Sequence, residues 1–353
     1  MMVGVRAVGQ IDSVQARPTS AYAREIRPLL SRDQFAPARS RLLWIPVHLS
    51  VLVSGALLLS AFQLPWLAWP LVSVIMGCSF AGLTFLGHET LHGAVVRGKS
   101  LRRLIGWLGF LPFVVSPRLW EAWHNRVHHN NTNAPGVDPD AYPTLDEYQQ
   151  NRAVRAVTEL APGRKRVTGA FSLLVGFSVQ SLHMLVDARR RQWLSPSEHT
   201  RAIAETLLGI AFWTALAVLL GPLAFVFAYV IPLVVANTIV MSFILTNHSL
   251  SPLTDVNDPL LNSLSVTGPR WFEWLTLGFG YHVEHHLFPA MSARHAPALR
   301  AILRTRWPAS YQSLPLLRAL RALHRSARVY ETQTTLLDPK TGRRWQTLTP
   351  KAA

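Results

Sequence analysis

Four apolar runs without a charged residue dominate the pattern of hydrophobic and polar positions along the chain. They cover residues 42–62, 66–86, 207–220 and 223–245. A helix needs about 20 apolar residues to cross a bilayer core of roughly 30 Å. Only the short breaks at 63–65 and 221–222 separate the two runs of each pair. The pattern therefore predicts an all-α integral membrane protein with two hairpins and about four spans.

Two shorter apolar stretches, residues 104–115 and 171–186, lie between the hairpins. Because they are too short to span comfortably, we expect interfacial or re-entrant helices there. Residues 1–40 carry six arginines but no short apolar core followed by a cleavage site. We therefore expect the first span to stay in the mature protein.

The charge of the chain agrees with a membrane protein. The 353 residues carry a formal net charge of +16, yet 15% are charged and 49% are hydrophobic. A nucleic-acid binder of this charge would carry many more charged residues along a patch, so that class is excluded. The single cysteine, Cys78, excludes an intramolecular disulfide and a thiolate metal site.

The basic residues crowd into three regions: the N-terminus, residues 97–201 and the chain after residue 270. Since Lys and Arg favour the cytoplasmic side, both termini and the middle segment are predicted to be cytoplasmic, with the bacterial inner membrane as the expected location. The predicted organisation is a basic tail over 1–40, a membrane domain over 41–310 and a second basic tail over 311–353. We expect the ends of the chain, roughly residues 1–35 and 325–353, to bury little.

Histidines are concentrated in three compact clusters. Of fourteen histidines, the clusters contain His88 and His92; His124, His128 and His129; and His282, His285 and His286. Because the clusters follow the second span, lie in the middle segment and follow the fourth span, the predicted topology puts all three on one side. A cytoplasmic helical cap can therefore bring them together.

The spacing within each cluster fits one face of an α-helix, where residues three and four apart are neighbours. His88 and His92 share such a face, and so do the three histidines of the last cluster. His124 and His128 also share a face, while His129 is rotated and could reach a second metal. Neutral imidazoles gathered in this way are typical transition-metal ligands. Eight of them exceed what one four-coordinate zinc uses, which indicates two metal ions.

Further residues near the clusters are candidates for the same site. His248 at the end of the fourth span is a ninth candidate ligand, and Asn247 beside it is a weaker one. Glu89 and Glu284 lie inside their clusters, so we expect them to orient metal-bound imidazoles. The run NNTNAPGVDPDAYP at 130–143 is rich in turn formers, and its Asn and Asp side chains could buttress ligands in the same way.

The remaining aromatic residues and histidines have less specific expected roles. Five aromatic residues lie near the clusters and could line a substrate tunnel, but we expect them to anchor the protein at the membrane interface: Trp120, Trp123, Trp271, Trp274 and Phe279. Apart from His248, five histidines lie outside the clusters and are expected to be structural or solvated: His48, His183, His199, His295 and His324.

At this point the sequence resembles the membrane fatty acid desaturases, whose hallmark is three histidine boxes. The chain has HETLH at 88–92, HNRVHH at 124–129 and HVEHH at 282–286, and the resemblance covers roughly residues 40–310. It implies a non-haem di-iron centre that uses O2 to desaturate a lipid-linked or thioester-linked acyl chain. The implied iron ligands are the eight clustered histidines, with His248 as the match to a further family ligand.

The resemblance also implies an external electron donor, because the chain lacks the HPGG motif of a fused cytochrome b5 domain. Ferredoxin, rubredoxin and cytochrome b5 are the candidate donors. Many front-end desaturases carry glutamine as the first residue of the third box, and His282 at that position disfavours this subgroup.

Three alternatives remain open from the sequence. Hydroxylases and ketolases that act on lipids or carotenoids share similar boxes, and fold does not fix the reaction outcome. The first box also matches the HExxH motif, in which Glu89 would serve a zinc intramembrane protease as general base. A non-enzymatic basic lipid-binding scaffold explains the charge but leaves the histidines without a role.

Overall fold

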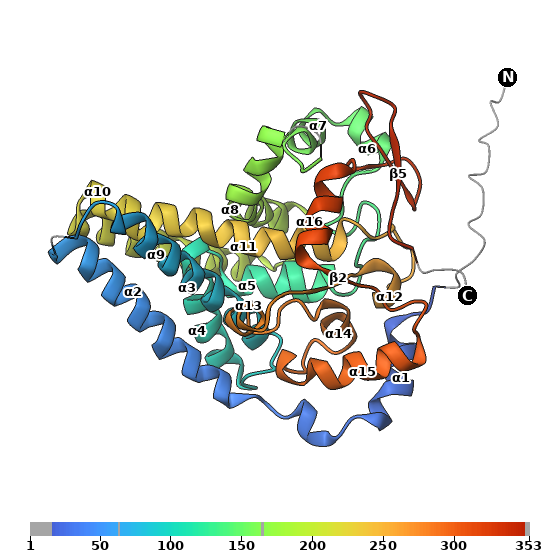
Figure 1. The fold of residues 1–353 in the computed structure, drawn as a ribbon, viewed down its shortest axis with the longest axis horizontal. Helices are drawn as coiled ribbons and strands as arrows, with labels where there is room; N and C mark the ends of the chain where they lie inside the picture. The colour runs from blue at the N-terminus through green and yellow to red at the C-terminus, as the bar shows by residue number, and fades with distance from the viewer. Residues whose placement is uncertain (1–15, 63, 164–165, 350–353) are drawn as a thin grey trace.

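Two helical hairpins form the elongated part of the molecule. The computed structural model describes residues 16–62, 64–163 and 166–349. The first hairpin consists of α2 (Trp44–Ala61) and α3 (Ala68–Leu91). The second consists of α9 (Pro196–Leu220) and a continuous run of α10 (Pro222–Phe225), η6 (Val226–Val230) and α11 (Ile231–His248). Both turns lie at the left-hand end of Figure 1, and the short helices and strands gather at the right.

Helix α3 is the central helix of the bundle. In its most apolar window 67% of the residues are buried, against 17% in α2 and α9, so those two helices present most of their apolar side chains outward. A Cβ atom on Gly77 would lie 2.5 Å from Cβ of Val235, so glycine permits the close approach of α3 and α11. The hydroxyl of Ser73 donates a hydrogen bond to the carbonyl of Phe227 at 2.6 Å and ties the two hairpins together.

Both intervening stretches are helical, and the second is longer than its apolar run; their interfacial placement stays a prediction. Residues 104–115 fall in the short helix α4 (Lys99–Phe110) and the turn η4 (Leu111–Phe113). Residues 171–186 instead belong to α8 (Arg166–Arg190), which has 25 residues. Its apolar part is a fifth segment long enough to cross a membrane, beside the four predicted ones. The helix extends beyond the apolar run because polar residues at its ends fit helical geometry as well as apolar ones do.

Short elements form a cap at the end of the bundle that carries the histidines. Before α8 these are α5 (Pro117–Trp120), η5 (Glu121–His128), α6 (Leu145–Gln150) and α7 (Arg152–Glu159). After α11 they are α12 (Pro259–Asn262), β1 (Ser265–Thr267), α13 (Arg270–Leu275), α14 (His282–Leu287), η7 (Ala293–His295), α15 (Ala296–Arg306), β2 (Ser313–Pro315) and α16 (Leu316–Arg325). Strands β1 and β2 pair in parallel, with Ser265 opposite Ser313.

The N-terminal segment packs on the cap. It contains α1 (Thr19–Ile26), η1 (Arg27–Leu29), η2 (Arg32–Phe35) and η3 (Arg39–Leu43). Tyr22 and Ile26 are fully buried in one apolar cluster with Val283 and Leu287 of α14. The expectation that this end buries little is therefore wrong for its described part.

The C-terminal segment also packs on the cap, through a three-stranded antiparallel sheet of β3 (Val329–Tyr330), β4 (Thr335–Leu337) and β5 (Arg344–Gln346). Several of its contacts are with the loop that follows α11. The Tyr330 hydroxyl donates to the carbonyl of Ser251 at 2.7 Å, and the backbone N–H of Leu253 donates to the carbonyl of Gln333 at 2.9 Å. The low burial expected for this end is therefore wrong too for the residues up to 349, whereas the domain boundaries stay a prediction.

Candidate metal centre

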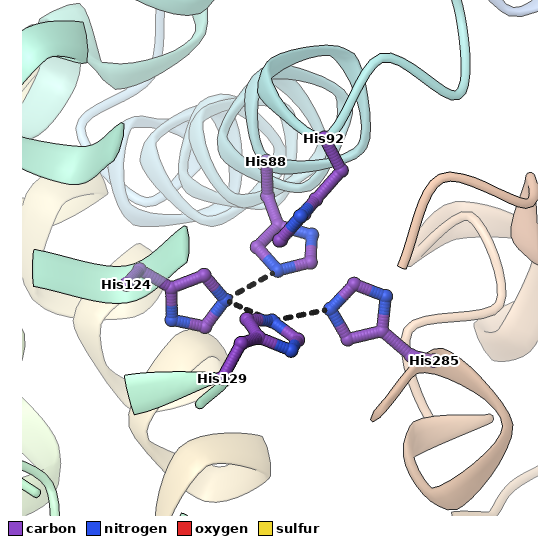
Figure 2. A group of neighbouring side chains, drawn as sticks. All are labelled: His88, His92, His124, His129 and His285. Atoms are coloured by element: carbon purple, nitrogen blue, oxygen red, sulfur yellow. Dashed lines mark hydrogen bonds between the residues drawn. The ribbon is translucent and has the colours of Figure 1, made fainter. Parts of the chain in front are cut away.

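Five histidines from three distant parts of the chain converge on one point. Group A consists of His88, His92, His124, His129 and His285, and each offers a ring nitrogen within 4.8 Å of the others. Figure 2 shows the five rings pointing toward a common centre, from α3, from the second cluster and from α14. The Nε2 atom of His124 lies 2.9 Å from Nε2 of His88 and 3.1 Å from Nε2 of His129.

A second group lies directly beside the first. Group B consists of His128, His248 and His286, again with ring nitrogens within 4.8 Å of one another. His282 borders this group, because its Nε2 atom lies 2.7 Å from Nε2 of His248 and 3.1 Å from Nε2 of His286. All nine histidines singled out in the sequence therefore meet in two adjacent groups.

The histidines of the second cluster contribute to both groups. Residues Glu121–His128 form a π-helix, in which the backbone N–H of His129 donates to the carbonyl of His124 at 3.0 Å. A π-helix brings residues five apart onto one face. His124 and His129 therefore belong to group A and His128 belongs to group B. His124 and His128 also form a third group with Asp140, within the same 4.8 Å, as expected of two residues that share a face. The division of these histidines between two metals stays a prediction.

The nitrogen positions fit bound metal ions. Two nitrogens about 2.1 Å from one ion and at right angles to each other lie roughly 3 Å apart, and the Nε2 atoms of His124 and His129 show this spacing. Nε2 of His92 is buried and has no hydrogen-bond partner among the described residues. A neutral imidazole has a single N–H, so hydrogen bonds among these rings cannot satisfy every ring nitrogen. A bound metal ion would be the partner of the nitrogens that are left.

The protonation state also suits ligation. Burial, followed by the neighbouring imidazoles, lowers the pKa of His124, His129 and His285 well below its ordinary value. These rings are therefore neutral at physiological pH, which is the form that binds a metal.

Carboxylates orient His128. Its Nδ1 atom lies 2.9 Å from Oδ1 of Asp138 and 3.4 Å from Oδ2 of Asp140. Burial alone lowers the pKa of His128, but the two carboxylates outweigh it and raise the pKa to about 9. At this pKa the ring without a metal carries a hydrogen on both nitrogens at neutral pH. The one on Nδ1 is donated to Asp138, and a metal ion in group B would replace the one on Nε2. The turn-rich run after the second box contains both aspartates, as its composition indicates.

The two glutamates expected to orient ligands have other partners. Glu284 accepts hydrogen bonds from Ser265 at 2.6 Å, Arg300 at 2.9 Å and Tyr311 at 2.6 Å. Glu89 accepts from Ser292 and, at 3.0 Å, from the backbone N–H of Ala293. These contacts hold the elements around the third box together.

Asn247, the weaker candidate, is fully buried beside His248. Its side chain makes no hydrogen bond within the described part of the chain. Both polar atoms of this amide therefore lack a protein partner at the edge of group B, and its assignment as a site residue stays a prediction.

A narrow apolar cavity leads to both groups from the bundle. It is lined by Thr84, Phe85, His88, Phe110, Trp120, Trp123, His124, His128, Asp140, Phe177, Val240, Ile244, His248, Phe279 and His282. Trp120, Trp123 and Phe279 thus line this cavity, which the sequence analysis did not favour. Trp271 and Trp274, in contrast, are 67% and 65% exposed, as expected of interface anchors.

Comparison with known proteins agrees with this site. Residues 64–316, more than half of the chain, match the family described as Fatty acid desaturase. The chain belongs to the fatty acid desaturase family. The family is metal-dependent, in agreement with the two histidine groups. The zinc protease alternative assigns no role to most of these histidines.

Individual desaturases are similar to the chain at low identity. The "sn-1 oleoyl-lipid 12-desaturase" of Synechocystis sp. is 22% identical, over 80% of this chain and 82% of the relative. The "sn-1 acyl-lipid omega-3 desaturase (ferredoxin)" of the same organism is 31% identical, over 35% of this chain and 34% of the relative. The "Omega-6 fatty acid desaturase, chloroplastic" of Glycine max is 22% identical, over 75% of this chain and 63% of the relative.

Proposed function

We propose that the protein is an O2-dependent desaturase that introduces a double bond into a fatty acyl chain carried by a membrane lipid. The observation that supports this most is the pair of buried histidine groups at the end of an apolar cavity. The mostly apolar walls of the cavity suit an acyl chain, and the imidazoles would hold two iron ions beside it.

Iron is proposed because of the chemistry required. A methylene C–H bond has no acidic proton, so the carboxylates of the site cannot remove it. Two irons bound by groups A and B would supply the oxygen-activating chemistry that an unactivated C–H bond needs. The protein contributes nine imidazole donors, the Asp138 carboxylate that orients His128 and the apolar walls that position the chain.

A lipid-linked chain is favoured over a thioester because two similar desaturases carry "oleoyl-lipid" and "acyl-lipid" in their names. Lipid mass spectrometry of cells that express the protein, with double-bond localisation, tests the function. We expect new double bonds in membrane acyl lipids. Hydroxylated or ketonic products would instead support the related hydroxylase or ketolase.

The proposed topology has four spans, with α8 lying along the membrane surface. Gly163, just before α8, lies against the backbone of Ser326 at the end of α16. Just after α8, the carbonyl of Trp193 accepts a hydrogen bond from Arg126 of the π-helix at 2.8 Å. Both ends of α8 thus touch the cap, which supports an interfacial helix. With four spans and basic residues inside, the termini and the histidines are cytoplasmic and the membrane is a bacterial inner membrane.

Cysteine labelling checks this topology. In a Cys78→Ser background, single cysteines at Val157 before α8 and at Ser197 after it should react with an impermeant maleimide from the same side of sealed vesicles. A cysteine at Leu219, near the far hairpin turn, should react only from the other side. Labelling of positions 157 and 197 from opposite sides would mean that α8 crosses the membrane.

The proposed electron donor is an acidic external carrier of the ferredoxin, rubredoxin or cytochrome b5 type. His92 is half-buried at the edge of group A, and the exposed residues Arg97 and Lys99 follow it in the chain. A positive surface speeds association with a negative partner, and salt screens the effect. Ferredoxin appears in the name of one similar desaturase, which supports this donor class.

Charge reversal at this surface tests the donor. The double variant Arg97→Glu/Lys99→Glu should lower kcat/KM for reduced ferredoxin about 10-fold at low salt, and the difference should shrink at high salt. Arg343→Glu is the matched control: Arg343 is exposed and directly precedes β5, a strand that lies away from α4 in Figure 1. Equal loss in control and variant, or no salt dependence, would refute docking beside His92.

A further inference from the structure

Four buried polar residues form a hydrogen-bonded cluster next to group B. This amide cluster consists of Thr132, Asn133, Thr254 and Asn262, each at most 5% exposed. It connects the loop after the second histidine box to the end of α11 and to the loop that follows α11. Buried polar groups at a metal site commonly hold its ligands in place, so the connections of each member matter.

Asn133 is the centre of the cluster. Its side-chain N–H groups face the carbonyls of His248 at 3.2 Å, Pro252 at 3.1 Å and Asn262 at 3.3 Å. Its backbone N–H donates to Oδ2 of Asp138 at 2.8 Å. With a φ of 55° it adopts the left-handed conformation that asparagine tolerates better than most residues. One side chain therefore joins the loop after the second box to the end of α11 and the loop that follows it, at least 115 residues further along the chain.

Each ligand of group B is tied to this cluster. The aspartate that accepts from His128, Asp138, also accepts from the backbone of Asn133. The hydroxyl of Thr132 donates to the carbonyl of His128 at 3.0 Å, so its oxygen can accept Nδ1–H of His286 at 3.2 Å. This leaves Nε2 of His286 for a metal.

The third ligand, His248, has two links to the cluster. Its Nδ1 atom lies 3.4 Å from the carbonyl of Asn262, and its own carbonyl accepts from Asn133. Group A is linked less directly: Nδ2 of Asn257 donates to the backbone carbonyl of His129 at 2.7 Å, and Oδ1 of Asn257 accepts from Asn262 at 3.1 Å. The cluster therefore reaches imidazoles of group B but only the backbone of group A.

We propose that Asn133 is a positioning residue for one metal of the pair, acting on the iron held by group B and not on the iron held by group A. This inference rests on the proposed di-iron function. The side-chain amide acts through carbonyls and loops, while the imidazoles themselves bind the metal.

Asn133→Gly removes the side-chain amide and keeps the backbone conformation, because glycine adopts the left-handed conformation readily. We expect about one iron per purified chain where the parent protein holds about two. The dissociation constant of the lost iron should rise about 10- to 100-fold, as for other partners of metal ligands. Activity should recover with added iron, and the KM for the acyl substrate should stay unchanged.

Asn131→Ala is the matched control. Asn131 lies two residues away and its amide donates only to the carbonyl of Val127 in the preceding turn, at 2.8 Å. This variant should keep both irons. Adding Asn133→Gly to a His285→Ala chain, which lacks a ligand of group A, should remove the remaining iron.

Thr132→Val is an independent test of the effect on group B, because it removes only the hydroxyl that faces Nδ1 of His286. It should also lose one iron selectively, and it decides the matter if the Asn133 variant fails to insert. Full iron affinity in both variants, or equal loss of both irons, would overturn the role in group B. A parent protein that binds a single zinc would refute the di-iron function instead, which is a distinguishable result.

Discussion

Replacing His285 with alanine is expected to abolish product formation while leaving a membrane-inserted protein. Nε2 of His285 lies 3.1 Å from Nε2 of His129, and its ring centroid lies 4.7 Å from those of His88 and His92. Loss of even a partner of a metal ligand costs about 10- to 100-fold in affinity or activity, so loss of a ligand should cost at least about 100-fold. Product per milligram of protein and iron per chain are the measurements.

His183→Ala is the control for this change. His183 lies on α8 outside both groups, and its side chain is 63% exposed beside Asp187. This variant should keep two irons and normal product formation. If His285→Ala retained full activity, the assignment of group A as a metal site would be wrong.

Filling the apolar cavity with Val240→Phe is expected to stop desaturation without removing the metal. Val240, on α11, is 3% exposed and lines the cavity together with Phe177 and Ile244. The larger ring occupies the path of the acyl chain, and misplacing a reactive carbon by about 1 Å already costs about 100-fold. The strain of overpacking, about 1–3 kcal/mol, is small enough for the fold to survive.

Iron content and product yield, measured on the same preparation, separate this effect from unfolding. We expect two irons per chain with product lowered about 100-fold. Val230→Phe is the matched control, because Val230 is 41% exposed on the outside of the same helical run. Normal yield from Val240→Phe would mean that the acyl chain does not use this cavity.

The sequence was sufficient to find the site because metal ligation leaves a local signature. His88 and His92 are one helical turn apart, and the hydropathy of the spans placed all three boxes at the same end. The π-helix could not be predicted, since His124, His128 and His129 have the same spacing whether the local hydrogen bonds are α-helical or not.

Contacts between distant segments also could not be predicted from the sequence. Asp138 orients His128 because the chain turns back after the second box, whereas Glu284 lies within the third box and yet pairs with Arg300 and Tyr311. Tyr22 and Ile26 are two apolar residues in a polar stretch, too few to predict packing against α14.

The position of the C-terminal sheet affects the order in which membrane insertion and metal loading occur. It holds the loop after α11 through Tyr330 and Gln333, and that loop leads to Asn262 beside group B. All the membrane helices leave the ribosome before these strands do. A nascent chain can therefore insert into the bilayer while the histidine centre still lacks its outer support, so we expect stable metal loading to follow the synthesis of the last strand.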